Sequence, residues 1–316
     1  MRIFPVLLAL LCATPALAGG KLPVKKLELS EHKKTFEYDL AYPQTGNASV
    51  DAQIAGWAKS MVKDFRDDAA GDDAGTAEHP YSMDITYDVV RNDAAMFAVI
   101  FQEEIDTGGV HPNHDIITFN FQMPDGWRVY LPEIFTADAL KTISALATAE
   151  LKRHFAATDT GDSEELAYGA GPDWDNFKDF ALMPEVLDIQ YPPYQVASYA
   201  DGPQETEIPL APLKKMFRAN WRLPVASFDC TAARTATEHA ICSDVALARL
   251  DRQEAEDYRS NSYYESDPAK KAALRDHQRD WLKNRDAACA GQRGGAQIAC
   301  LTAAYKKRLA TPRGEL

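Results

Sequence analysis

The sequence predicts an α+β domain with a mainly antiparallel sheet, followed by a small all-α domain that disulfides staple together. Its 316 residues suit two domains better than one. The net charge changes from −16 over residues 19–226 to +2 over residues 227–316. Four of the five cysteines lie in the second, nearly neutral part of the chain: Cys230, Cys242, Cys289 and Cys300.

The first residues have the composition of a secretory signal. Arg2 precedes the apolar run 6–11, and a small-x-small motif ends at Ala18, where we expect cleavage. The expected signal peptide therefore spans 1–18. No later segment is long and apolar enough to span a bilayer, so we expect a periplasmic or secreted protein without a membrane anchor.

The first domain is expected at 19–224, with hairpins that favour an antiparallel sheet. Alternating apolar residues predict a strand over 24–42, and apolar residues spaced by three and four predict a helix over 49–66. The remaining expected elements are strands at 83–89, 96–101, 115–122 and 127–131, a helix at 137–156, a polar, mobile loop at 157–172, a short helix at 173–180, strands at 186–191 and 205–210, and a helix at 211–219.

The second domain is expected at 228–316, after a linker around Pro224. Thr235 and Glu238 have the spacing of a capping box, and Asp267 followed by proline is a strong helix start. An even number of cysteines in an exported module predicts two disulfides. Closeness in sequence favours Cys230–Cys242 with Cys289–Cys300, although a hairpin of the two long helices would instead bring Cys242 near Cys289.

The segment EEIDTGGVHPNHD is the first candidate contact site. Its two histidines lie near carboxylates, but they are three residues apart around Pro112, and no third ligand has motif spacing, so we expect no metal. Its glycines instead predict a turn with backbone angles that other residues avoid. The candidate binding residues are Glu103, Glu104, Asp106, Gly108, Gly109, His111 and Asn113.

The segment YPPYQVASYADGP is the second candidate, with Tyr191, Tyr194 and Tyr199. Exposed tyrosines stack on sugars or anchor a protein interface. The alternative is a rigid crossover loop whose rings pack inward, and the sequence leaves both interpretations open.

Nothing in the sequence indicates catalysis or a cofactor. It contains no G-x-S-x-G elbow and no serine with a recognisable His/Asp partner motif, and no carboxylate pair is singled out by its spacing. We therefore expect a protein that is not an enzyme and has no cofactor. The acidic first domain would repel phosphate, so nucleic acid is not an expected partner.

The second domain resembles the LprI-type lysozyme-inhibitor family. The matching residues are Cys230, Glu238, Ile241, Cys242, Leu247, Leu250, Asp251, Tyr258, Gln278, Arg279, Trp281, Leu282, Arg285, Asp286, Cys289 and Cys300. The first domain resembles the extracellular, lysozyme-sensing module of RsiV-type anti-sigma factors, which also accompanies PdaC-type peptidoglycan deacetylases. Three phrases carry that resemblance: GGVHPNHDIITFNF, LPEIF and YPPYQVASYADGPQETEIPL.

Both resemblances imply a partner at the bacterial cell wall. They imply binding, and possible inhibition, of a cationic lysozyme-like muramidase, toward which the acidic domain would steer. The alternative function is binding of peptidoglycan fragments through the tyrosines. The anti-sigma helix, its transmembrane segment and a deacetylase domain have no counterpart here, so neither sigma-factor control nor deacetylation is implied.

Overall fold

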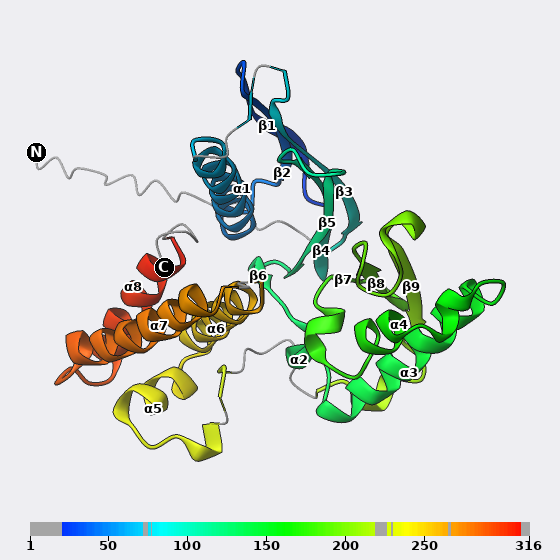
Figure 1. Ribbon diagram of the computed structural model, residues 1–316. Coiled ribbons are helices and arrows are strands. Elements are labelled where there is room, and N and C mark those ends of the chain that lie inside the picture. The colour runs from blue at the N-terminus through cyan, green and yellow to red at the C-terminus, as the bar shows by residue number, and fades with distance from the viewer. Residues whose placement is uncertain are drawn as a thin grey trace, which may run out of the picture.

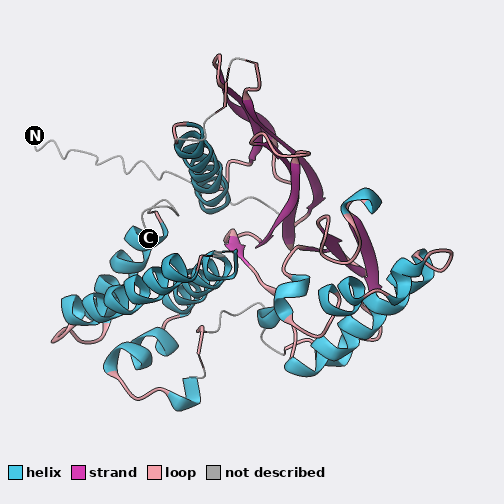
Figure 2. Cartoon of the chain, in the orientation of Figure 1, coloured by secondary structure: helices cyan, strands magenta, loops and turns pink. Residues whose placement is uncertain are grey.

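The computed structural model describes residues 21–71, 75–76, 78–218, 226–228, 230–264 and 267–310. Figures 1 and 2 show three neighbouring groups of elements: a long sheet with one helix beside it, a smaller sheet with its own helices, and a group of helices near the C-terminus. The expected signal peptide and the linker around Pro224 lie outside the described residues.

The first sheet has the strand order β1-β2-β3-β4-β5-β6 among the described residues. All its pairs are antiparallel except β2 with β3, which are parallel, so the prediction of a mainly antiparallel sheet is confirmed. The strands are β1 (Lys25–His32), β2 (Phe36–Gln44), β3 (Tyr81–Asn92), β4 (Met96–Asp106), β5 (Asn113–Gln122) and β6 (Trp127–Arg128).

The single strand predicted over 24–42 is wrong, because this segment forms the β1–β2 hairpin. The backbone turns between Lys33 and Phe36, whose N–H and C=O join at 2.8 Å. The apolar alternation continues on both sides of the turn, which is why it resembles one long strand.

Helix α1 (Ala48–Ala69) connects the parallel pair and packs on one face of the sheet. Its N-cap is Asn47, whose side chain accepts from the backbone of residues 49 and 50. Ile54, Trp57 and Phe65 lie on its buried face, as the spacing predicted. The Trp57 ring packs 4.3 Å from the ring of Phe101, which fixes the helix against β4.

The second sheet has the order β7-β8-β9 and is antiparallel. Helix α3 covers it, and the buried apolar residues of both form one continuous core. The elements of this part are α2 (Leu131–Ile134), α3 (Ala137–His154), α4 (Glu164–Gly169), β7 (Phe180–Leu182), β8 (Val186–Tyr191), β9 (Gln204–Pro209), and 3-10 turns at Asp159–Asp162, Trp174–Phe177, Tyr199–Asp201 and Lys214–Met216.

Two predicted elements are replaced around Phe135. The strand predicted over 127–131 ends after Arg128, because the carboxylate of Glu133 accepts from the backbone of residue 130 and starts α2. The helix predicted over 211–219 is only a 3-10 turn. Phe217 forms a β-bridge with Phe135 instead, and this backbone pairing competes with helix formation.

The segment 157–172, predicted as a polar, mobile loop, contains α4. Ser163 caps this helix through a bond from the Leu166 N–H at 3.1 Å, and Leu166 is buried. The short helix predicted over 173–180 is a 3-10 turn that ends before β7 begins at Phe180. These short elements are held by caps and burial more than by periodicity.

The C-terminal part is helical, as predicted, and both favoured disulfides are present: Cys230–Cys242 and Cys289–Cys300. The capping box at Thr235 and the Asp267 N-cap both form. The helices are α5 (Ala236–Ser243), α6 (Val245–Tyr264), α7 (Pro268–Cys289) and α8 (Gly295–Leu309), and a 3-10 turn lies at Cys230–Ala232.

The helical part touches the first sheet at β6. Trp127 packs against the apolar cluster of the helices. The Arg249 guanidinium lies 5.3 Å from the centre of the Trp127 ring and donates to the Gln122 side chain at 2.9 Å. Arg252 lies 3.9 Å from the carboxylate of Glu133. Among the residues that the structure describes, the two parts therefore share this ring and these polar contacts, while their apolar cores are separate.

Candidate functional site

The two candidate segments lie together at one end of the first sheet. One is the turn between β4 and β5, and the other is the loop between β8 and β9. His111 stacks on Tyr199 with ring centres 3.8 Å apart, and Tyr194 lies 5.5 Å from Tyr199. We name His111, Tyr194 and Tyr199 the aromatic cluster.

Hydrogen bonds hold the aromatic cluster in place. The Tyr199 hydroxyl donates to the Pro112 carbonyl at 2.9 Å. Nδ1 of His111 lies 2.8 Å from the same carbonyl, which can only accept, so this nitrogen carries the proton. Nε2 then accepts from the Tyr194 hydroxyl at 3.1 Å. The three rings therefore form one continuous aromatic surface. Tyr194 is its exposed member, with 60% of its surface open to solvent.

The turn itself depends on one of the two predicted glycines. Gly108 has a φ angle of 82°, and its N–H bonds to the Asp106 carboxylate at 2.8 Å. Gly109 has no positive φ angle, so the prediction is confirmed at Gly108 and wrong at Gly109. Glu104 and Asn113 are exposed beside this turn, and Glu103 is half-buried. Burial, and next the charge of Glu104, raise the pKa of Tyr199, so this acidic candidate lies near the aromatic cluster.

Tyr191 does not belong to this surface. Its side chain is fully buried in the core under α3, and its hydroxyl lies 3.2 Å from that of Thr206. Burial raises the pKa of Tyr191 far above its usual range. The inward-packing interpretation therefore holds for Tyr191, and the exposed interpretation holds for Tyr194.

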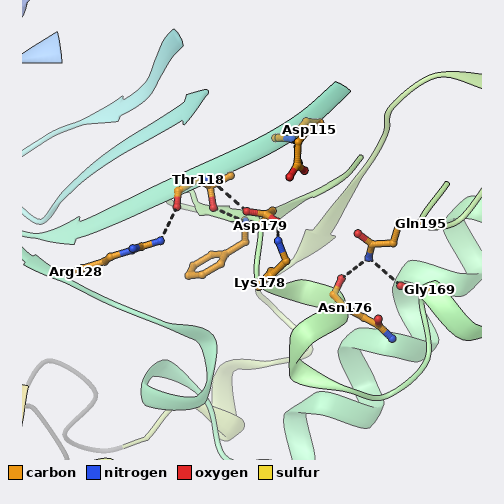
Figure 3. Close-up of polar contacts among 10 residues, drawn as sticks. Asp115, Thr118, Arg128, Gly169, Asn176, Lys178, Asp179 and Gln195 are labelled. Carbon is orange, nitrogen blue, oxygen red and sulfur yellow. Dashed lines mark hydrogen bonds and ion pairs between the residues drawn. The ribbon is translucent and has the colours of Figure 1, made fainter. Parts of the chain in front are cut away.

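Two polar anchors position the loop between β8 and β9. Figure 3 shows the Gln195 amide donating to the carbonyls of Gly169 and Asn176, at 3.0 and 2.9 Å. Gly169 ends α4 so close to this loop that an added Cβ would lie 1.8 Å from the Gln195 carbonyl oxygen. Glycine is thus required at position 169 for the loop to approach.

A polar seam joins the second sheet to β5, also seen in Figure 3. The Thr118 hydroxyl accepts from the Phe180 N–H at 2.9 Å, and its own N–H donates to Asp179 at 3.3 Å. The buried Asn120 side chain donates to one β7 carbonyl and accepts from the Leu182 N–H. These bonds replace strand pairing between the sheets and fix the β8–β9 loop over the β4–β5 turn.

A groove of about 800 Å³ opens next to the aromatic cluster, between the ends of β4 and β5, the strands β8 and β9, and the last turns of α3. Tyr199 forms part of its wall. Five carboxylates line it: Glu103, Asp115, Glu150, Glu205 and Glu207. Burial raises the pKa of Asp115, which lies near Lys178 and Asp179. The groove is therefore an acidic surface of the size of a small-molecule site.

The sequence did not identify this groove. Asp115 is in the first candidate segment, but Glu150 lies on α3 and Glu205 and Glu207 lie on β9. No local motif joins them, because the fold assembles the groove from distant elements. The alternation of Glu205 and Glu207 with buried Thr206 and Ile208 is the one signal that predicts an acidic strand face.

Three of the residues that carry the resemblance to the LprI family, Asp251, Gln278 and Arg285, belong to a polar network inside the helices. The buried Tyr305 hydroxyl donates to Asp251 at 2.6 Å and accepts from Arg285. The Gln278 amide donates to Glu254 at 2.9 Å. The network holds α6, α7 and α8 together, so these buried residues stabilise the fold.

Among the described residues, no group of three His, Cys, Asp or Glu side chains is arranged to hold a metal ion. No described helix has the length and apolar character needed to cross a membrane.

Comparisons with known proteins identify two regions of the chain. Residues 132–211 match DUF3298, a family described as of unknown function, and residues 230–311 match the family described as lysozyme inhibitor LprI. The chain thus carries a DUF3298 domain followed by an LprI domain. The second domain's predicted resemblance is confirmed by the family match. Together with the disulfides, it indicates an extracytoplasmic compartment.

The peptidoglycan-N-acetylmuramic acid deacetylase PdaC of Bacillus subtilis is 26% identical over 190 residues. The match covers 60% of this chain but only 40% of PdaC. A DUF3298 protein of Pseudomonas aeruginosa PAO1 has a TM-score of 0.50 at 13% identity, over 63% of this chain and 96% of that one. A DUF3298 member from Bacteroides fragilis has a TM-score of 0.49 at 18% identity, and the match covers 64% of this chain and 95% of that one. The Pseudomonas structure supports the fold of the first part of the chain.

Proposed function

We propose that this protein binds a cationic lysozyme-like muramidase at the cell envelope and inhibits it without catalysis. The match of residues 230–311 to the lysozyme inhibitor LprI is the observation that carries this proposal. The net charge of −16 over residues 19–226 supports it, because opposite charge speeds the encounter with a cationic protein.

The aromatic cluster is the proposed anchor of this interface. Tyr194 is exposed and bonds to His111 of the neighbouring turn, and Glu104 and Asn113 are exposed on the two strands that this turn joins. Aromatic anchors surrounded by charged residues are typical of the centres of protein interfaces. In this arrangement, the acidic side chains guide the partner, and the rings retain it.

Surface plasmon resonance on an immobilised cationic lysozyme tests the proposal, with muramidase activity measured in parallel. The intact protein should bind, should lower the activity, and should associate more slowly as salt shortens the Debye length below about 10 Å. Neutralising the turn with Glu103→Gln, Glu104→Gln and Asp106→Asn should slow association.

Two matched controls make the result specific. Glu164→Gln, Glu165→Gln and Glu185→Gln remove the same charge from exposed positions outside the site and should change association less. Tyr168 is 78% exposed on α4, so Tyr168→Ala should leave dissociation unchanged, whereas loss of the Tyr194 ring should speed it. Absence of binding by the intact protein at low salt contradicts the proposal.

A second candidate function is binding of peptidoglycan fragments. The partial match to a peptidoglycan deacetylase and the exposed Tyr194 ring favour it. Co-sedimentation of the protein with insoluble peptidoglycan tests this alternative separately, because no muramidase is present in that assay.

A further inference from the structure

The acidic groove has a distribution of hydrogen-bonding groups that selects its ligand. No lysine or arginine is among the described residues that line it, while its carboxylates number five and its histidines, His114 and His154, number two. Glu205 and Glu207 are exposed along one side, and Glu103 and Asp115 lie opposite each other on β4 and β5. The groove therefore attracts a cation and repels an anionic ligand.

The amides of the groove also present acceptors. The NH₂ group of Gln190 donates to Asp188 at 2.6 Å, and that of Gln204 donates to the carbonyls of Asp201 and Gly202. Each of these amides thus uses at least one hydrogen on an internal bond, and its oxygen is an acceptor for a ligand. The Tyr199 hydroxyl is likewise used on Pro112. Donors of a ligand can therefore pair with the carboxylates and amide oxygens, and its acceptors with His114 and His154.

The aromatic wall favours a sugar. A saccharide presents hydroxyl groups, each of which donates, and its ring packs against an aromatic side chain such as Tyr199. An ammonium group on the sugar adds charge-assisted bonds to carboxylates.

We propose that the groove between β4–β5, β8–β9 and α3 binds an oligosaccharide of amino sugars whose amines are free, in which ammonium groups meet the carboxylates. This inference sharpens the second candidate function, wall-glycan binding, and does not depend on muramidase binding. The neighbouring Asp188 is consistent with it, since its pKa is raised by burial and also by the charges of Glu205 and Glu207. N-acetylation removes the ammonium charge, so it should weaken binding.

Isothermal titration calorimetry on the full chain tests the proposal at pH 6 and low salt. The probes are a β-1,4-linked tetramer of glucosamine, the same tetramer fully N-acetylated, and a pentalysine peptide. We expect the glucosamine tetramer to bind at least tenfold more tightly than either other probe. Glu205→Gln with Glu207→Gln should weaken its binding at least tenfold, whereas Glu164→Gln with Glu165→Gln should not.

Each other outcome overturns the proposal. If the acetylated tetramer binds equally well, the ammonium charge of the ligand does not contribute to binding. If pentalysine binds equally well, the groove is a general cation-binding surface. Unchanged binding by the Glu205→Gln, Glu207→Gln variant places the sugar elsewhere. If insoluble peptidoglycan is retained while the glucosamine tetramer does not bind, the second candidate function stands and this inference fails.

Discussion

Tyr194 combines exposure with backbone strain. It is the one non-glycine residue with a positive φ angle among the described residues, at 70°, where most side chains cost about 1–2 kcal/mol. Strain of this kind is kept where a side chain has a use. The ring is placed outward at a cost in stability, which agrees with its proposed role as an anchor.

Replacing Tyr194 by asparagine, which tolerates this backbone region, should separate the two effects. The variant loses the bond to His111 but relieves strain, so we expect its free energy of unfolding to equal that of the native protein or to exceed it by up to about 1 kcal/mol. Its affinity for the muramidase should fall. Urea denaturation and surface plasmon resonance measure the two quantities, and a clear loss of stability would instead identify the ring as a packing element.

Gly169 and Gly56 form a matched pair for the same substitution. Gly169→Ala places a Cβ against the Gln195 backbone and should destabilise the protein by about 2 kcal/mol or more. Gly56 is exposed within α1, and nothing lies within 4 Å of its added Cβ, so Gly56→Ala should stabilise by about 1 kcal/mol. Thermal denaturation of both variants checks the pair; equal effects contradict the assigned contact.

Asp188 makes the stability depend on pH. Burial raises its pKa to about 6 in the folded protein, above the ordinary value of 3.8. The folded state therefore binds the proton more tightly than the unfolded chain, so ionised Asp188 lowers stability above pH 6, and this penalty disappears as the pH falls from 6 toward 4.

Asp188→Asn should remove that penalty. The side chain is half-buried, so solvent screening reduces the effect to about 1 kcal/mol. We expect the variant to be more stable than the native protein at pH 8 and equally stable at pH 4, as measured by urea denaturation at both values. A constant difference across this range rules out Asp188 as its source.

At the scale of the elements, the disulfides stabilise helices that are too small to bury a sufficient apolar core. Cys289–Cys300 closes the turn from α7 to α8, and Cys230–Cys242 ties the segment before α5 to its end. Loops of 11 and 12 residues each contribute roughly 3 kcal/mol in the chain-entropy model.

Removing either disulfide with paired alanine substitutions should therefore lower the free energy of unfolding by similar amounts. We expect a loss of roughly 3 kcal/mol for Cys289→Ala with Cys300→Ala, and for Cys230→Ala with Cys242→Ala. Chemical denaturation under oxidising conditions measures both. Adding reductant to the native protein should reproduce the combined loss, and a variant unaffected by its missing bridge contradicts this account.

Periodic elements were predictable from the sequence, and elements held by tertiary pairing were not. Helix α1 buries one regular apolar face, and β4 begins with a continuous apolar run that is buried throughout, so their patterns are strong. The 3-10 turn near Lys214 replaces a predicted helix because Phe217 pairs with Phe135, which is distant in sequence. The two loops of the aromatic cluster were identified from composition, but their contact was not, because it depends on how Gln195 anchors one of them.

At the scale of the whole molecule, the predicted domains at 19–224 and 228–316 have separate apolar cores but share the contact at Trp127. A fragment of residues 228–316 should be helical and melt cooperatively when oxidised, and reductant should abolish the transition. Its melting temperature should be below that of the same region in the full chain, because Trp127 no longer covers the helices. Circular dichroism measures this; a disordered oxidised fragment contradicts independent folding.

The parallel pairing of β2 with β3 has a consequence for the order of assembly. The β1–β2 hairpin and the β3–β4–β5 meander connect neighbours in sequence and can each form within microseconds. Joining them pairs Phe36 with Tyr81, and the entropy of closing that long segment must be lost before the contact stabilises anything. Docking of α1 brings the two strands together, so the slow step of folding should involve this helix, and shortening Ile54 should slow folding more than altering the turn at Lys33.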